Sequence, residues 1–225
     1  MFNKKTLSEK LRLYLVCGEG ESCGPLMRKA EQALAGGVTA VQLRVKSWDS
    51  RDMFGAACQL QGLCRRFDAL FIVNDRLDVA LACGADGVHL GQNDLPIDAA
   101  RKIAPADFII GATANTRPDV LKAQKLGADY IGCGAAFTTA TKHDVNVIGP
   151  AGIKDAVGQA SVPCVAIGGI TLENLRRLAD CGCGGISLSS EIMSHPNPKR
   201  RTQELFKEIN LFFKHADRQN EKGSL

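Results

Sequence analysis

Basic and amide side chains alternate with apolar ones in the segment Val41-Gln42-Leu43-Arg44-Val45-Lys46. Residues two apart share one face of a strand, so Gln42, Arg44 and Lys46 should point the same way. Facing outward under a helix, the two cations would be buried without partners, which is costly. Facing inward near the end of the strand, they would form a clamp for a phosphate or diphosphate. The alternative for Lys46 is a solvated lysine in a loop.

Two carboxylates follow two later apolar segments. Asp75 stands in Asn74-Asp75-Arg76, and Asp94 ends a segment that begins at His89. Mg²⁺ in proteins takes one or two carboxylates together with substrate phosphates and water. Each aspartate could instead be the N-cap of the helix that follows it, a common role for Asp. Beside the basic clamp, the pair favours a Mg²⁺ site at Asp75 and Asp94.

An alternation of short apolar and longer amphipathic segments must position these residues. The apolar segments span 13–17, 40–44, 70–74, 87–90, 108–113, 130–134, 164–169 and 185–190. The amphipathic segments span 25–35, 49–65, 77–83, 96–103, 117–126, 149–157, 172–181 and 201–213. Nearly continuous apolar strands are typical of a parallel sheet covered on both faces. Eight such units predict an α/β fold with a single (β/α)8 TIM barrel, and a doubly wound open sheet is the alternative.

The carboxyl ends of barrel strands carry further groups that could bind an anion. The loop after 130–134 contains Thr139, Thr141 and Lys142. Gly169 follows the seventh predicted strand, and Ser189 and Ser190 end the eighth. Loops after strands seven and eight are the habitual phosphate site of this fold.

The four histidines stand in unrelated settings, and no Ser-His-Asp or Cys-His arrangement is visible. The sequence therefore argues against acyl transfer. A metal-bound diphosphate is a leaving group, which favours displacement at carbon or phosphorus.

Composition limits the class of protein. The chain has 225 residues, of which 45% are hydrophobic and 23% charged, which fits one globular domain over 1–225. We expect a barrel over about 12–214 and a polar tail at 215–225. Aromatic residues make up only 5% and the charges are mixed, which argues against nucleic-acid binding. No apolar run is long enough for a membrane helix.

The nine cysteines are scattered and include no C-x-x-C pair. An odd number without metal-ligand spacing indicates free thiols in a reducing compartment, so we expect a cytoplasmic protein. The sequence leaves open whether the chain forms a homodimer.

Five motifs stand in the order and spacing of one enzyme family. They are Gln42-Leu43-Arg44-x-Lys46, Asn74-Asp75-Arg76, His89-Leu90-Gly91-Gln92-x-Asp94, Thr139-x-Thr141-Lys142 and Ala166-Ile167-Gly168-Gly169-Ile170. Over about residues 10–195 the chain resembles the thiamine-phosphate synthases. That family joins hydroxymethylpyrimidine diphosphate to thiazole phosphate and releases diphosphate, so the resemblance implies an alkyl or aryl transferase of thiamine biosynthesis.

The resemblance also implies a role for each matching residue. Asp75 and Asp94 would hold Mg²⁺ on the diphosphate. The pyrimidine diphosphate would be bound by Gln42, Arg44, Lys46, Asn74, Lys142 and Thr113, the last where the family usually has serine. The thiazole phosphate would be bound by Thr139, Thr141, Gly169, Ser189 and Ser190. Arg44, Lys46, Thr113 and Lys142 would act in catalysis.

The family's mechanism is dissociative. Diphosphate leaves first, and the thiazole nitrogen captures the resulting pyrimidine methylene cation. Such a reaction uses electrostatic stabilisation and orientation rather than a general base. The alternatives are a thiazole tautomerase of the same superfamily, which needs neither diphosphate nor metal, a non-catalytic barrel that senses phosphate ligands, and a sugar-phosphate isomerase barrel.

Overall fold

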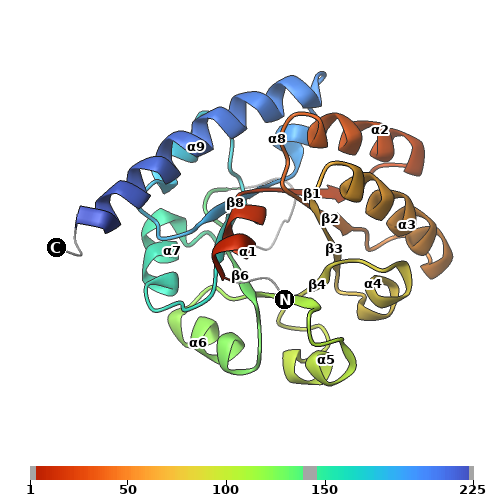
Figure 1. The fold of residues 1–225 in the computed structure, drawn as a ribbon, viewed down its shortest axis with the longest axis horizontal. Coiled ribbons are helices and arrows are strands. Elements are labelled where there is room, and N and C mark those ends of the chain that lie inside the picture. Colours follow the sequence, from red (N-terminus) through yellow and green to blue (C-terminus); the bar gives the residue numbers. More distant parts are fainter. Residues whose placement is uncertain (1–3, 139–145, 223–225) are drawn as a thin grey trace.

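The protein is a closed barrel of eight parallel strands. The computed structural model describes residues 4–138 and 146–222, with side chains as far as residue 211. Each strand pairs with the next in sequence order, and β8 pairs with β1 to close the sheet (Figure 1). The strands are β1 Leu13–Gly18, β2 Ala40–Arg44, β3 Leu70–Asn74, β4 Gly87–Leu90, β5 Ile109–Thr113, β6 Tyr130–Gly134, β7 Cys164–Ile167 and β8 Gly185–Leu188. The predicted TIM barrel is confirmed, and the open sheet is wrong.

Helices surround the barrel and alternate with its strands (Figure 1). The helices are α1 Lys4–Lys10, α2 Cys23–Leu34, α3 Ser50–Arg66, α4 Leu77–Cys83, α5 Ile97–Ile103, α6 Arg117–Lys125, α7 Gly149–Val157, the 3₁₀ helix η1 Leu175–Leu178, α8 Ser190–Met193 and α9 Pro198–Lys222. Although α9 has 25 residues, no helix in the described part of the chain is both long and apolar enough to cross a membrane.

Several predicted boundaries are wrong. Strand β8 ends at Leu188 rather than 190, so Ser189 and Ser190 follow the strand, and Ser190 begins α8. The segment 172–181 forms only the short η1, because the Asn174 side chain bonds the Thr171 N–H and the Gly169 carbonyl in place of regular helical contacts. Strand β7 ends at Ile167 rather than 169, since the next two glycines have φ of 97° and 63°. The segment predicted as a tail from 215 is helical as far as Lys222.

The first helix closes one end of the barrel. Leu7 of α1 and Leu11 pack in one buried apolar cluster with Tyr14, Tyr130 and Val165 from the strands. In Figure 1, α1 lies across the barrel opening. The end of the barrel where the strands terminate is left for the residues that the sequence predicts as a site.

The large Tyr130 ring fits inside the barrel because the facing strand carries a glycine. Tyr130 pairs with Gly111 across β5 and β6, and the Tyr130 side chain is fully buried. A Cβ added at Gly111 would lie 2.1 Å from Cζ of the ring. Contacts this short do not occur between non-bonded atoms, so the ring and a side chain at 111 exclude each other.

We expect Gly111→Ala to lower the free energy of unfolding by roughly 1–3 kcal/mol, because the methyl group overpacks the barrel interior. Gly55→Ala is the matched control: Gly55 lies on the exposed face of α3, and an added Cβ meets nothing within 4 Å. Alanine there should stabilise the helix by about 0.5–1 kcal/mol. Urea unfolding of both variants measures the difference, and equal effects would contradict the packing argument.

Candidate active site

A continuous chain of hydrogen bonds crosses the barrel interior. Gln42 Nε2 donates to the Tyr14 hydroxyl at 2.8 Å, and that hydroxyl lies 2.9 Å from the Tyr130 hydroxyl. The Tyr130 hydroxyl is 3.0 Å from His89 Nδ1, and His89 Nε2 is 3.0 Å from Thr113 Oγ1. Five strands thus contribute to one polar network above the apolar base of the barrel.

The amide at one end of this network fixes one of its donors, because Gln42 Nε2 can only donate to the Tyr14 hydroxyl. Each of the other three contacts holds a single proton between its two atoms, and the tautomer of His89 decides which atom donates. Burial raises the pKa of both tyrosines, so both stay protonated.

Arg44, the last residue of β2, and Lys46, just beyond the strand, lie at the barrel mouth. The Gln42 side chain is buried inside the barrel, and Arg44, two residues on, is 16% exposed with Nη1 3.9 Å from Glu19 Oε2. Lys46 lies in the loop after β2 with its side chain 57% exposed, and its Nζ is 2.8 Å from Asp75 Oδ2. Two cations therefore stand beside one of the predicted metal ligands.

The two predicted carboxylates meet above the ends of β3 and β4. Asp75 and Asp94 are joined by a side-chain hydrogen bond. The Asp75 backbone N–H donates to the His89 carbonyl at 2.9 Å, and Asp94 Oδ2 accepts from the Gly91 N–H at 2.6 Å. Neither aspartate caps a helix. The N-cap residue is Arg76 in α4 and Pro96 in α5, and neither of these two N-cap residues makes a capping side-chain hydrogen bond. The N-cap alternative is wrong for both.

The carboxylate pair divides its charge unequally. Burial alone would raise the pKa of Asp75, but hydrogen bonds from Asp94 and Lys46 outweigh it and lower that pKa. Burial and the neighbouring Asp75 raise the pKa of Asp94. Two adjacent carboxylates need a proton or a cation between them, and two hard oxygen ligands beside a phosphate clamp fit Mg²⁺.

The remaining predicted residues lie in the loops that end other strands. Asn74 is buried at the end of β3, while Ser189 is half-buried and Ser190 exposed after β8. Gly169 is in the left-handed region, where an added Cβ would lie 2.3 Å from the Thr138 carbonyl oxygen, so the loops after β6 and β7 are in close contact. The predicted residues Thr139, Thr141 and Lys142 lie outside the described part of the chain.

The predicted residues thus form two groups around the mouth. One group lies at the ends of β2 to β5 and consists of Gln42, Arg44, Lys46, Asn74, Asp75, Asp94 and Thr113. The other lies just beyond β7 and β8 and consists of Gly169, Ser189 and Ser190. The order of strands in the closed barrel places these groups on different sides of the same opening.

Residues 13–192 match the family described as thiamine monophosphate synthase. The chain belongs to this family. It is 44% identical to a thiamine-phosphate synthase of Pyrococcus abyssi over 201 residues, which cover 89% of this chain and 96% of the relative. A thiamine-phosphate synthase of Coprothermobacter proteolyticus is 47% identical over 195 residues, which cover 86% of this chain and 92% of the relative.

A solved structure agrees with this membership. Thiamine phosphate pyrophosphorylase from Pyrococcus furiosus superposes with a TM-score of 0.85 at 41% identity, over 92% of this chain and 98% of that chain. Both the sequence and the fold of the thiamine monophosphate synthase family thus extend over nearly the whole chain. The family resemblance expected from the five motifs is confirmed.

The sequence analysis missed the interior residues that link Gln42 to Thr113 in this family member. Tyr14 and Tyr130 read as ordinary members of apolar strands, and His89 was set aside with the other histidines. Side chains alternate between the two faces of each strand, and this alternation could have revealed these residues. Once the strand register is known, residues 14, 89 and 130 lie on the same inward face as Gln42.

We expect Asp94→Asn to raise the free energy of unfolding of the metal-free protein at about pH 7. Because the folded protein raises the pKa of Asp94, the wild type loses stability as the pH rises through that pKa. The gain from asparagine should therefore vanish at about pH 4, where Asp94 is protonated. Urea unfolding in EDTA at both pH values measures the stability gain of Asp94→Asn. A gain of the same size at both pH values would contradict the raised pKa of Asp94.

Proposed function

We propose that this chain is a Mg²⁺-dependent thiamine-phosphate synthase that joins hydroxymethylpyrimidine diphosphate to thiazole phosphate. As a family member the chain is a transferase that makes thiamine phosphate. The observation that supports the metal and the diphosphate is the contact of Asp75 with both Asp94 and Lys46. This contact joins a cation-binding carboxylate pair to a cationic clamp.

The diphosphate end of the site works by electrostatics. Asp75 and Asp94 would hold Mg²⁺, which when bound neutralises charge on the departing diphosphate. Arg44 and Lys46 would bind the same group and stabilise the negative charge that builds up as it leaves. Lys142, from the loop after β6, would complete the clamp.

The pyrimidine would lie above the polar network of the interior. Gln42, Asn74 and Thr113 would contact it, with the Thr113 hydroxyl held by His89. Because Tyr14 and Tyr130 stay protonated, the two phenols beneath the ring carry no charge. Neutral phenols held by hydrogen bonds would orient the ring without trapping the pyrimidine methylene cation.

The thiazole phosphate would bind where the loops after β7 and β8 meet the loop after β6. Gly169 brings its backbone close to the other loops, and Ser189 and Ser190 supply hydroxyl and N–H donors, with Thr139 and Thr141 as further contacts. Holding both halves at the barrel mouth sets the thiazole nitrogen against the methylene carbon. The C–O bond to diphosphate breaks, the new C–N bond forms, and no general base is needed.

The alternatives make less use of these residues. A thiazole tautomerase or a sugar-phosphate isomerase would have no role for both the carboxylate pair and the two basic residues of β2. A sensor would bind both ligands without releasing diphosphate. The nine cysteines are free in the structure, and five of them are buried. We place the enzyme in the cytoplasm, since free thiols persist in a reducing compartment.

The direct test incubates the purified protein with hydroxymethylpyrimidine diphosphate, thiazole phosphate and Mg²⁺. We expect thiamine phosphate and diphosphate in equal amounts, with formation of both abolished by EDTA and restored by added Mg²⁺. Chromatography of thiamine phosphate and an enzymatic diphosphate assay measure the two products. Tight binding of both substrates without any product would favour the sensor, and full activity in EDTA would exclude the metal.

We expect Asp75→Asn to lower kcat by roughly 100-fold or more, because Mg²⁺ supplies several kcal/mol of transition-state stabilisation. The matched control is Asp78→Asn, on the exposed side of α4, where Asp78 pairs with Arg76 at the surface. Such an exposed pair is worth little, so the control should keep full activity. A Mg²⁺ titration of kcat measures both variants, and full activity of Asp75→Asn at all Mg²⁺ concentrations would refute its assignment as a ligand.

A further inference from the structure

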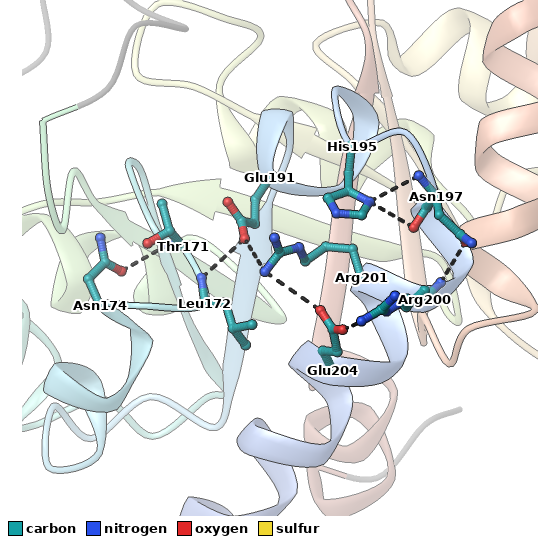
Figure 2. Close-up of polar contacts among 9 residues, drawn as sticks. All are labelled: Thr171, Leu172, Asn174, Glu191, His195, Asn197, Arg200, Arg201 and Glu204. Carbon is teal, nitrogen blue, oxygen red and sulfur yellow. Dashed lines mark hydrogen bonds and ion pairs between the residues drawn. The ribbon is translucent and has the colours of Figure 1, made fainter.

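The loops that follow β7 and β8 are joined by one mostly buried carboxylate (Figure 2). Glu191 lies in α8 directly after Ser190, and its side chain is 15% exposed. Glu191 Oε1 accepts from the Leu172 N–H at 3.2 Å and lies 3.4 Å from Arg201 Nη1. One oxygen atom thus links the loop after β7, the start of α8 and the long helix α9.

The rest of the loop after β7 is fixed by Asn174. Its Oδ1 accepts from the Thr171 N–H at 2.9 Å, and its Nδ2 donates to the Gly169 carbonyl at 2.8 Å (Figure 2 shows the bond to Thr171). With the bond from Leu172 to Glu191, side chains restrain the backbone from Gly169 to Leu172 at both ends. Backbone donors stabilise an anion best when they are held in place before it binds.

Arg201 attaches this carboxylate to a tightly packed helix. A Cβ added at Gly36, after α2, would lie 2.6 Å from the Lys199 carbonyl oxygen and 2.7 Å from Thr202 Cβ, so α9 is in close contact with the end of α2. Arg201 is itself 19% exposed, and Nη1 is also 3.7 Å from Glu204 Oε2 (Figure 2). The position of Glu191 therefore depends on the packing of α9 against the barrel.

The ion pair also matters for charge. Glu191 immediately follows Ser189 and Ser190, two residues proposed to bind the thiazole phosphate. An uncompensated carboxylate there would repel the phosphate, and screening by salt is weak for partly buried charges. Arg201 removes that repulsion.

We propose that Glu191 and Arg201 are positioning residues for the thiazole phosphate half of the site. Glu191 fixes the loop after β7 through the Leu172 N–H, while Arg201 orients Glu191 and neutralises its charge. Neither residue is assigned a contact with the substrate. This inference rests on the proposed function, because it names a substrate phosphate.

Glu191→Ala should raise KM for thiazole phosphate roughly tenfold, the loss expected for one charge-assisted hydrogen bond. The KM for the pyrimidine diphosphate should stay unchanged. Glu191→Gln keeps an oxygen that accepts from Leu172, so its KM should stay within about threefold of the wild type. Arg201→Met leaves the carboxylate unpaired and should raise KM for thiazole phosphate further than Glu191→Ala does. The double variant Glu191→Gln/Arg201→Met should recover most of that loss.

The matched control is Arg176→Met, which removes an exposed ion pair between η1 and Glu208 of α9 without touching the loop. It should change neither KM. Unchanged KM for thiazole phosphate in Glu191→Ala, or equal increases for both substrates, would overturn the inference. If Glu191→Ala does not fold, absence of recovery in the double variant overturns it instead. Failure of the proposed function is a different result, because the wild type would then form no thiamine phosphate.

Discussion

The closed barrel leaves a narrow interior, and every feature of the site depends on how that space is filled. Side chains alternate between the interior and the helices, so each strand contributes only two or three inward residues. Gly111 leaves the room that the Tyr130 ring occupies, and Leu7 of α1 together with Leu11 seals the base. Tyr14 and Tyr130 pack against this base, and the charged residues predicted for the site lie at the end where the strands terminate.

Within that limit, hydrogen bonding determines which groups stay neutral. The network from Gln42 to Thr113 is complete, and burial keeps its tyrosines protonated. A buried polar group that finds a partner avoids the desolvation cost of an unsatisfied one. The two buried tyrosines therefore give the interior polar groups that carry no charge, which suits the proposed binding of a pyrimidine ring next to a diphosphate.

The mouth combines charges that are unfavourable without a ligand. Asp75 and Asp94 share a hydrogen bond at the expense of a raised pKa for Asp94, with Lys46 as a partial counter-charge. A family member that only needed to fold would gain from losing one of these carboxylates, whereas the proposed Mg²⁺-dependent reaction would need both. The proposed thiazole phosphate site is built differently, because Asn174 and Glu191 hold its backbone while Arg201 lies beside the Glu191 carboxylate.

The sequence by itself determined the barrel, because the alternation of short apolar and longer amphipathic segments reflects local physics. Four predicted strands, at β2, β3, β4 and β6, have the observed bounds. It also determined the residue types at the strand ends, and so the predicted clamp and carboxylate pair. The helix predicted over 172–181 from its apolar period is wrong, because the Asn174 side chain hydrogen-bonds the loop backbone there and only the short η1 forms.

Only the tertiary structure decided which of these residues meet. The hydrogen bonds from Tyr14 to Tyr130 and from Tyr130 to His89 join residues 116 and 41 positions apart, and no local pattern encodes them. The same holds for Glu191, which stands in none of the five sequence motifs and meets Arg201 only through the packing of α9. Residue types and the spacing of apolar residues are properties of the sequence. Hydrogen-bond partners, burial and the pairing of charges arise only when the strands close into a barrel and the helices pack around it.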